Sequence, residues 1–239
     1  MTYPGGKNGS GVAQAIINQI PPHRIYIEAF LGSGAIMRTK KPAEISCGID
    51  SNKSVIYRWN SGEWRLPPGA IAVLGDAISA LKFREYQGGE FVYCDPPYLF
   101  DVRSSNRDIY ENEFGTPEQH AELISVLRSL PCRVMLSGYW SELYADLLKD
   151  WRTVSFNTTD RGGNLKEEWL WMNYPEPEAL HDYRFLGSKF RERERLARFR
   201  RRWVARLQRM DQLERLMLSA AIAESSGVAG GIAVSDGPR

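Results

Sequence analysis

The sequence predicts an α/β fold in which a mostly parallel, seven-stranded sheet is covered by helices on both faces. Short apolar runs alternate with segments whose apolar residues have helical spacing, and this alternation is typical of a doubly wound sheet. Glycine or aspartate follows each of the first four runs, as expected at the edge where such a sheet binds ligands. No helical segment separates the last two runs, so we expect them to form an antiparallel hairpin.

The strands are expected where apolar residues gather between turn-forming residues. They are predicted at residues 24–30, 45–49, 70–74, 91–94, 133–137, 153–156 and 168–172. Helices are predicted at residues 8–20, 51–60, 116–130, 140–148 and 185–222. Pro21-Pro22 ends the first helix, and Thr116-Pro117 begins the third with a capping threonine and a proline in the first turn.

Charge is distributed unevenly along the chain. The net charge is +2, but residues 1–180 carry 18 Lys/Arg and 22 Asp/Glu, whereas residues 181–215 carry 12 and 5. We therefore expect an α/β domain over 1–180, a basic helical extension over 181–222 and a disordered, glycine-containing tail over 223–239. A basic extension on a mildly acidic domain favours a polyanionic partner.

The expected C-terminal helix allows three interpretations. It can be a DNA-binding arm, since its arginines include Arg198, Arg201 and Arg202. It can be the coiled coil of a homodimer, because its apolar residues follow an approximate heptad. It can also be a solvated helix that packs on the chain's own core.

Other classes of protein are disfavoured by composition. The sequence has no apolar run long enough to span a membrane and no apolar signal region. Its three cysteines, Cys47, Cys94 and Cys132, lie in or beside apolar segments, which predicts buried thiols in a reducing cytoplasm. The three histidines are scattered, so no metal site is expected.

Asp95-Pro96-Pro97-Tyr98 directly follows the apolar run at 91–94. An acid can accept a hydrogen bond from an amino N–H, and the prolines leave the carbonyls of Asp95 and Pro96 without local N–H partners. The Tyr98 ring offers a face on which an unstacked base can lie. The motif suits methyl transfer to the exocyclic amino group of a base, although the same four residues can also form an ordinary turn.

Three other strand ends carry residues that suit a nucleoside cofactor. Gly32 and Gly34 follow the first strand and allow the backbone to approach a ligand closely, but the third glycine of the dinucleotide motif is missing. Asp50 follows the second strand and can bind ribose hydroxyls. Asp76 follows the third strand and can accept from an adenine amino group. Each aspartate can equally be a helix cap.

Together these motifs resemble the Dam-like, α-group N6-adenine DNA methyltransferases of phage and prophage type, over about residues 3–174. The resemblance implies a Rossmann-like methyltransferase fold, S-adenosylmethionine as cofactor and catalysis by Asp95, Pro96, Pro97 and Tyr98. It also implies a set of residues that contact the cofactor. That set is Tyr3, Gly6, Lys7, Glu28, Phe30, Gly32, Gly34, Asp50, Asp76, Ala77 and Asp95.

The chain departs from larger members of that family, which insert a target-recognition domain between the third and fourth strands. Only residues 77–90 lie there, so we expect short or relaxed sequence specificity. The expected DNA contacts are instead Arg103, Arg107 and Tyr110 in a polar loop at 99–116, Arg161 in a turn, and the arginines of the C-terminal helix. An RNA adenine methyltransferase, a cytosine-N4 DNA methyltransferase and an inactive DNA-binding relative are the alternatives.

Overall fold

A computed structural model of the chain describes residues 7, 11–99, 114–159 and 165–225. The chain divides into two compact units, Met1–Leu186 and Gly187–Arg239. Residues 181–186, which the sequence assigns to the helical extension, belong to the first unit. The His181 N–H donates to the Ile20 carbonyl, and Asp182 accepts from the Lys41 N–H.

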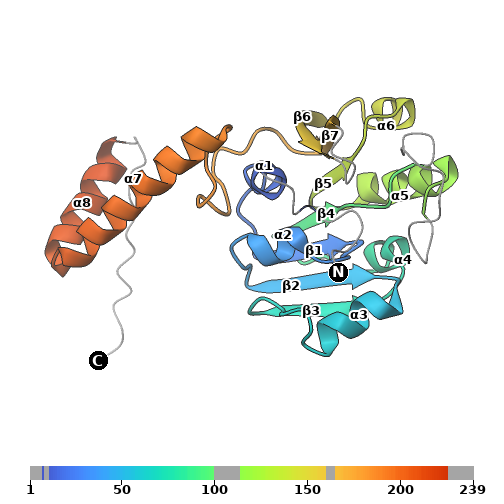
Figure 1. The fold of residues 1–239 in the computed structure, drawn as a ribbon, viewed down its shortest axis with the longest axis horizontal. Coiled ribbons are helices and arrows are strands. Elements are labelled where there is room, and N and C mark those ends of the chain that lie inside the picture. Colours follow the sequence, from blue (N-terminus) through green and yellow to red (C-terminus); the bar gives the residue numbers. More distant parts are fainter. Residues whose placement is uncertain (1–6, 8–10, 100–113, 160–164, 226–239) are drawn as a thin grey trace. The chain divides into compact units, whose positions relative to one another are not determined.

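A seven-stranded sheet in the order β3-β2-β1-β4-β5-β7-β6 forms the centre of the first unit (Figure 1). Its strands are β1 (Ile25–Ala29), β2 (Ile45–Asp50), β3 (Ala70–Leu74), β4 (Glu90–Cys94), β5 (Arg133–Gly138), β6 (Arg152–Thr159) and β7 (Leu165–Met172). β7 runs antiparallel to both of its neighbours, whereas the other neighbouring pairs are parallel. The predicted sheet and its final antiparallel hairpin are confirmed.

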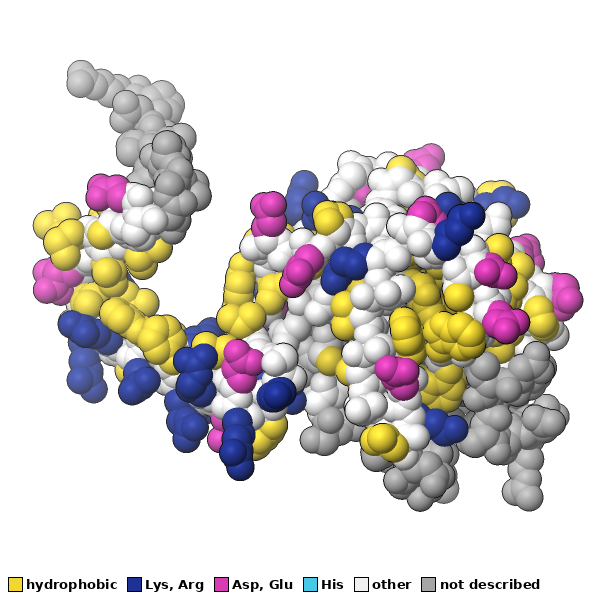
Figure 2. All heavy atoms as spheres, turned by 90° about the horizontal axis from the view of Figure 1, so that it is seen from above, with side chains coloured by type: hydrophobic (Ala, Val, Ile, Leu, Met, Phe, Trp, Pro, Cys, Tyr) yellow, Lys and Arg dark blue, Asp and Glu magenta, His cyan; other side chains and the backbone are white. Residues whose placement is uncertain are grey.

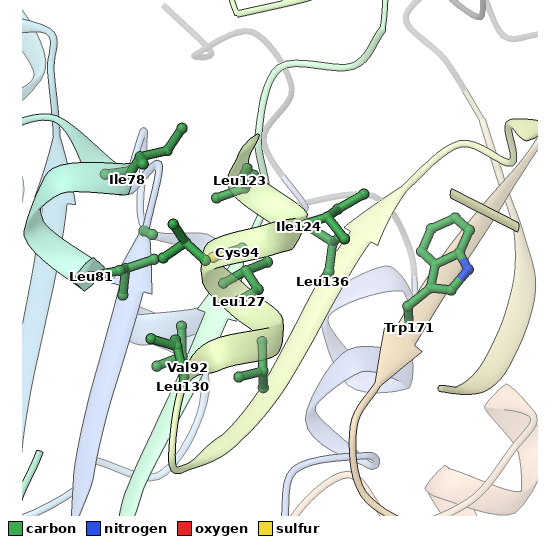
Figure 3. Packing of buried hydrophobic residues seen from close by; sticks show 14 of the residues in the cluster. Ile78, Leu81, Val92, Cys94, Leu123, Ile124, Leu127, Leu130, Leu136 and Trp171 are labelled. Carbon is green, nitrogen blue, oxygen red and sulfur yellow. The ribbon is translucent and has the colours of Figure 1, made fainter. Parts of the chain in front are cut away.

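Helices cover both faces of the sheet and bury one apolar cluster on each. On one face lie α1 (Val12–Ile17), α2 (Ala35–Thr39) and α3 (Lys53–Asn60). On the other lie α4 (Ala77–Lys82), α5 (Pro117–Ser129) and α6 (Glu142–Leu147). Figure 3 shows this second cluster, in which Leu123, Ile124 and Leu127 of α5 contact side chains from the strands. Cys94 is completely buried there, as expected.

Two helices, α2 and α4, are missing from the expectations drawn from the sequence. They have five and six residues, too few for helical periodicity to be distinguished from a turn. The start of α5 was predictable, because Thr116 and Gln119 form a capping box in which each side chain accepts from the other's backbone N–H.

The described part of the second unit, residues 187–225, contains two helices, α7 (Phe190–Arg209) and α8 (Gln212–Ser225), and the expectation of one helix over 185–222 is wrong. Met210 is extended, and Asp211 and Glu214 then cap a new helix reciprocally at 2.9 and 3.0 Å. Residues 223–225 of the expected tail are helical, and the rest of that tail lies outside the described residues. Within the described ranges no helix has the length and apolarity to cross a membrane.

A glycine fixes the contact between the loop after β1 and α3. Gly34 has a φ of +58°, and a Cβ added to it would lie 2.6 Å from the indole of Trp59. That indole is buried and donates to the Gly32 carbonyl at 3.0 Å. The loop can therefore lie against Trp59 only if residue 34 has no side chain.

Gly34→Ala is expected to destabilise the fold by about 2–4 kcal/mol, because it combines left-handed backbone strain with overpacking. Gly62→Ala is the matched control, since Gly62 has a φ of +81° but open space around its Cβ position. The control should cost only about 1–2 kcal/mol, from backbone strain alone. Urea denaturation of both variants measures the difference, and equal losses would show that the Trp59 contact is unimportant.

Candidate active site

The carboxyl ends of β2, β1 and β4 lie next to one another because these strands are neighbours in the sheet. The Gly32 N–H, after β1, donates to the Asp50 carboxylate at the end of β2, at 2.8 Å. The Asp95 N–H, after β4, donates to the Ala29 carbonyl at 3.5 Å. These two hydrogen bonds connect the ends of β2 and β4 to the end of β1, so that the three strand ends meet at one edge of the sheet.

The loop after β1 has an unusual backbone. Phe30, Gly32 and Gly34 all have left-handed φ values, of 59°, 48° and 58°, and a non-glycine residue in that region marks local strain. The Ser33 hydroxyl inside this loop is buried and has no hydrogen-bond partner among the described residues. Since buried polar groups are ordinarily paired, this hydroxyl suits a polar ligand bound against the loop.

Asp50 and Asp76 occupy different environments. Asp50 is 8% exposed, and its two carboxylate oxygens accept from the Gly32 and Asn52 N–H groups at 2.8 Å each. Burial raises the pKa of Asp50, against the effect of these hydrogen bonds. Asp76 caps α4 by accepting from the Ser79 N–H at 2.8 Å. The cap that the sequence allowed at Asp76 is present, whereas at α3 the capping residue is Asn52.

A cluster of polar side chains surrounds Asp95. Its Oδ1 accepts from the Lys7 ammonium at 2.8 Å and from the Ser137 hydroxyl at 2.9 Å. Ser137, which is buried in β5, is itself 2.9 Å from the Tyr93 hydroxyl. Oδ2 of Asp95 has no hydrogen-bond partner within the described part of the chain. One oxygen of this carboxylate is therefore fixed by the protein, while the other can accept from a ligand.

Glu168 also belongs to this cluster, and it comes from β7, the strand next to β5 in the sheet. Its Oε1 accepts from the Lys7 ammonium and from the Tyr98 hydroxyl, at 2.7 Å each, and Lys7 also contacts that hydroxyl. The Tyr98 ring lies 4.4 Å from the Tyr139 ring, centroid to centroid, with their planes tilted by 52°. Tyr98 is thus held at its hydroxyl and along its ring.

The charges of the cluster follow from burial and pairing. Burial lowers the pKa of Lys7, but the carboxylates of Asp95 and Glu168 outweigh it and raise that pKa well above its usual value. Burial, together with Asp95, raises the pKa of Glu168 against the opposing effect of Lys7. Burial and Glu168 raise the pKa of Tyr98. At neutral pH Lys7 is therefore an ammonium and Tyr98 a neutral phenol, and two carboxyl groups share one buried cation.

Three members of this cluster, Ser137, Tyr139 and Glu168, were not among the predicted site residues. Glu168 left a signal in the sequence, because an acid directly precedes the apolar run Trp169–Met172 in a strand. Buried acids are rare unless paired. Nothing in the local sequence indicates that its partner is Lys7, which lies 161 residues away.

Glu28, a predicted cofactor residue, lies within β1 rather than in the loop that follows. Its Oε2 accepts from the Tyr26 hydroxyl and from the Met37 N–H, at 2.8 Å each. Burial raises the pKa of Glu28 to about 8 although these hydrogen bonds lower it. The acid is therefore protonated at neutral pH in the folded chain.

The remaining predicted site residues lie in different environments. Pro96 and Ala77 are buried, and Pro97 is half-buried. Arg198, Arg201 and Arg202 lie exposed on α7. Tyr3, Gly6, Arg103, Arg107, Tyr110 and Arg161 lie outside the described residues. Within residues 7, 11–99, 114–159 and 165–225 no group of His, Cys, Asp and Glu could hold a metal ion.

The raised pKa of Glu28 makes stability depend on pH. Unfolded Glu loses its proton near pH 4.3, whereas folded Glu28 keeps it to about pH 8. Its contribution is therefore complete below about pH 4.3 and declines, by up to about 1.4 kcal/mol per pH unit, as the pH rises through 8. Melting temperatures of wild type and Glu28→Gln at pH 6 and 8.5 test this. Wild type should lose more between the two than the variant does, and parallel shifts would contradict the assignment.

Comparisons with known proteins agree with this geometry. Residues 77–161 match the family model described as D12 class N6 adenine-specific DNA methyltransferase. No curated protein matches the chain in sequence.

Three of the solved structures that are similar to the chain are the following. TrmK from M. capricolum with S-adenosyl-homocysteine has 9% identity and a TM-score of 0.46, covering 90% of this chain and 95% of that one. Magnesium protoporphyrin IX methyltransferase from Synechocystis PCC 6803 with bound SAM has 16% identity and a TM-score of 0.43, covering 68% of this chain and 74% of that one. A dimethyladenosine transferase from Plasmodium falciparum has 13% identity and a TM-score of 0.42, covering 67% of this chain and 59% of that one.

The first unit is a doubly wound α/β domain with a mostly parallel seven-stranded sheet, and the segment that carries Asp95-Pro96-Pro97-Tyr98 lies within the match to the D12 class model.

Proposed function

We propose that the chain transfers a methyl group from S-adenosylmethionine to the N6 amino group of adenine in DNA, and that its first unit is the catalytic domain. The observation that carries this proposal is the hydrogen bonding of the Asp95 carboxylate. This acid lies at the carboxyl end of the central strand β4, with Oδ1 held by Lys7 and Ser137 and Oδ2 available to a ligand. Two prolines and a firmly held tyrosine follow it.

The residues at the ends of β1, β2 and β3 suit the cofactor. The loop at 30–34 has left-handed φ values at Phe30, Gly32 and Gly34, and the unpaired Ser33 hydroxyl calls for a polar group there. Asp50 would bind the ribose hydroxyls, Asp76 the adenine amino group, and Tyr3, Gly6, Lys7 and Glu28 the methionine end. Bound S-adenosylmethionine supplies a methyl group on a positively charged sulfur, which is an electrophile that needs no further activation.

The target base must leave the duplex before its amino group can reach Asp95, at a cost of a few kcal/mol. Oδ2 of Asp95 would accept one amino hydrogen and the Pro96 carbonyl the other, so that the nitrogen lone pair points along one direction. Stacking on the Tyr98 ring recovers part of the cost of flipping. As the nitrogen bonds to the methyl carbon, the bond between that carbon and the sulfur would break and release S-adenosyl-homocysteine. The nitrogen would then lose a proton, for which Asp95 would be the acceptor.

Lys7 and Glu168 would position the two groups that touch the base. The Lys7 ammonium donates to Oδ1 of Asp95 at 2.8 Å, and such a charge-assisted hydrogen bond fixes the orientation of the carboxylate. It also ties Asp95 to Glu168. Glu168 holds the Tyr98 hydroxyl and so sets the angle of the ring. Positioning of this kind accounts for a large part of the rate in reactions that need little bond activation.

Asp95→Ala is expected to abolish transfer of labelled methyl from S-adenosylmethionine to DNA, because the amino group loses its acceptor. Binding of S-adenosylmethionine, measured by calorimetry, should stay within about tenfold of wild type, since the ribose and adenine contacts remain. Digestion of the product DNA to nucleosides identifies the methylated base, and a parallel RNA substrate tests the nucleic acid. Normal turnover by this variant would refute the role of Asp95.

Tyr98→Ala should lower the rate by about 10–100-fold, because stacking on an aromatic ring is worth about 1–3 kcal/mol per base. Tyr98→Phe keeps the ring and the Lys7–Glu168 ion pair, so its loss should stay below about tenfold, the value of one hydrogen bond. Single-turnover rates with saturating cofactor compare the two. Equal losses would assign the role to the hydroxyl instead of the ring.

A further inference from the structure

The two helices of the second unit present apolar surface that no residue of its described part, 187–225, covers. No residue of α7 or α8 is buried. The large apolar side chains of these helices that are exposed are Phe190, Phe199, Trp203, Val204, Leu213, Leu216, Met217 and Ile222. α8 has only three charged residues, Glu214, Arg215 and Glu224, and a helix that is apolar on most sides is ordinarily packed against a partner.

The charged and apolar surfaces of the unit are separate. On α7, Leu196, Phe199, Trp203 and Leu207 are spaced by three, four and four residues, so they share one face. Nine arginines and two glutamates make up most of the rest of this helix. Figure 2 shows the basic side chains gathered on one side of the helical unit and hydrophobic side chains on another. Arg206, next to the seam, lies with its guanidinium 5.5 Å from the Trp203 ring centroid, so its stem extends the apolar face.

We propose that a second copy of this chain covers the apolar face, so that two α7–α8 pairs form a four-helix bundle at the centre of a homodimer. A nucleic acid cannot cover this face, because phosphates pair with the arginines and leave the apolar side chains in water. A second copy offers the same heptad-spaced side chains, which is what an isologous interface requires.

Charge complementarity favours the second copy as well. α7 carries a net charge of +7, whereas α8 and the residue before it carry three acids, Asp211, Glu214 and Glu224, and one arginine. If α8 of one copy packs on α7 of the other, these acids meet the basic helix of the partner. Two copies joined through their basic faces would instead place like charges together.

The size of the face suits a stable dimer. α7 has 20 residues and α8 has 14, which correspond to about 30 and 21 Å of helix at about 1.5 Å per residue. Two helices of about 10 Å diameter therefore offer several hundred Å² per copy, near the roughly 800 Å² of a standard interface. The arginines stay outside such a bundle and remain free to meet a polyanion.

Sedimentation velocity of the full-length chain without DNA tests the proposal. Wild type at about 10 μM should sediment at twice its mass of 27.2 kDa. The double variant Leu213→Glu/Met217→Glu should be a monomer, with a dissociation constant raised at least about 100-fold, because two buried apolar side chains become charged. These two residues are 77% and 69% exposed in the single chain and lie one turn apart, so the variant should keep its helices.

Circular dichroism verifies that helical content is unchanged, and Leu213→Gln/Met217→Gln repeats the test without added charge. Arg201→Gln/Arg202→Gln is the matched control on the basic face and should remain dimeric. A monomeric wild type at 100 μM would overturn the proposal and indicate that the chain's own first unit covers the face. A dimer that survives the apolar variants, or that is lost equally in the arginine variant, would overturn it too. None of these outcomes depends on the proposed methyl transfer.

Discussion

One buried cation organises the candidate active site. The Lys7 ammonium lies within 2.8 Å of carboxylate oxygens of both Asp95 and Glu168. Asp95 directly follows β4, and Glu168 lies in β7. Without it, two acids would face each other across a buried space, and burying an unpaired carboxylate is costly. The electrostatics that fix Asp95 therefore depend on a residue from the start of the chain, far in sequence from both of its partners.

The order of the strands in the sheet explains how a few short loops can form the candidate site. Placing β1 between β2 and β4 puts the left-handed loop, Asp50 and Asp95 at one edge, so that cofactor and base residues come from three short loops. The antiparallel β7 then contributes Glu168 from the opposite direction. A parallel strand at that place would present its loop, instead of a mid-strand acid, at the same edge. The reversal of the final hairpin thus belongs to the site as much as to the fold.

Much of this arrangement could be predicted, and the failures have physical causes. Strand positions, the order of the strand-end motifs and the role of Cys94 as core followed from local patterns. The contacts around Asp95 did not: Lys7 was predicted only as a cofactor contact, and Ser137 and Glu168 come near Asp95 only through pairing of β4, β5 and β7 in the sheet. Short helices such as α2 lack the length that periodicity needs, and the break at Met210 depends on the Asp211–Glu214 cap, which interrupts an otherwise continuous apolar spacing.

The division of charge between the two units bears on how a polyanion would be bound. Residues 1–180 carry a net charge of −4, whereas α7 alone carries +7. A net negative first unit repels a nucleic acid at long range, so attraction must come from the second unit, over a distance that salt shortens to about 8–10 Å. If the substrate is DNA, affinity and chemistry then belong to different parts of the chain. Affinity would fall steeply with salt, by about one power of salt concentration per phosphate contacted, while the ion pairs of the buried Lys7 would be screened far less.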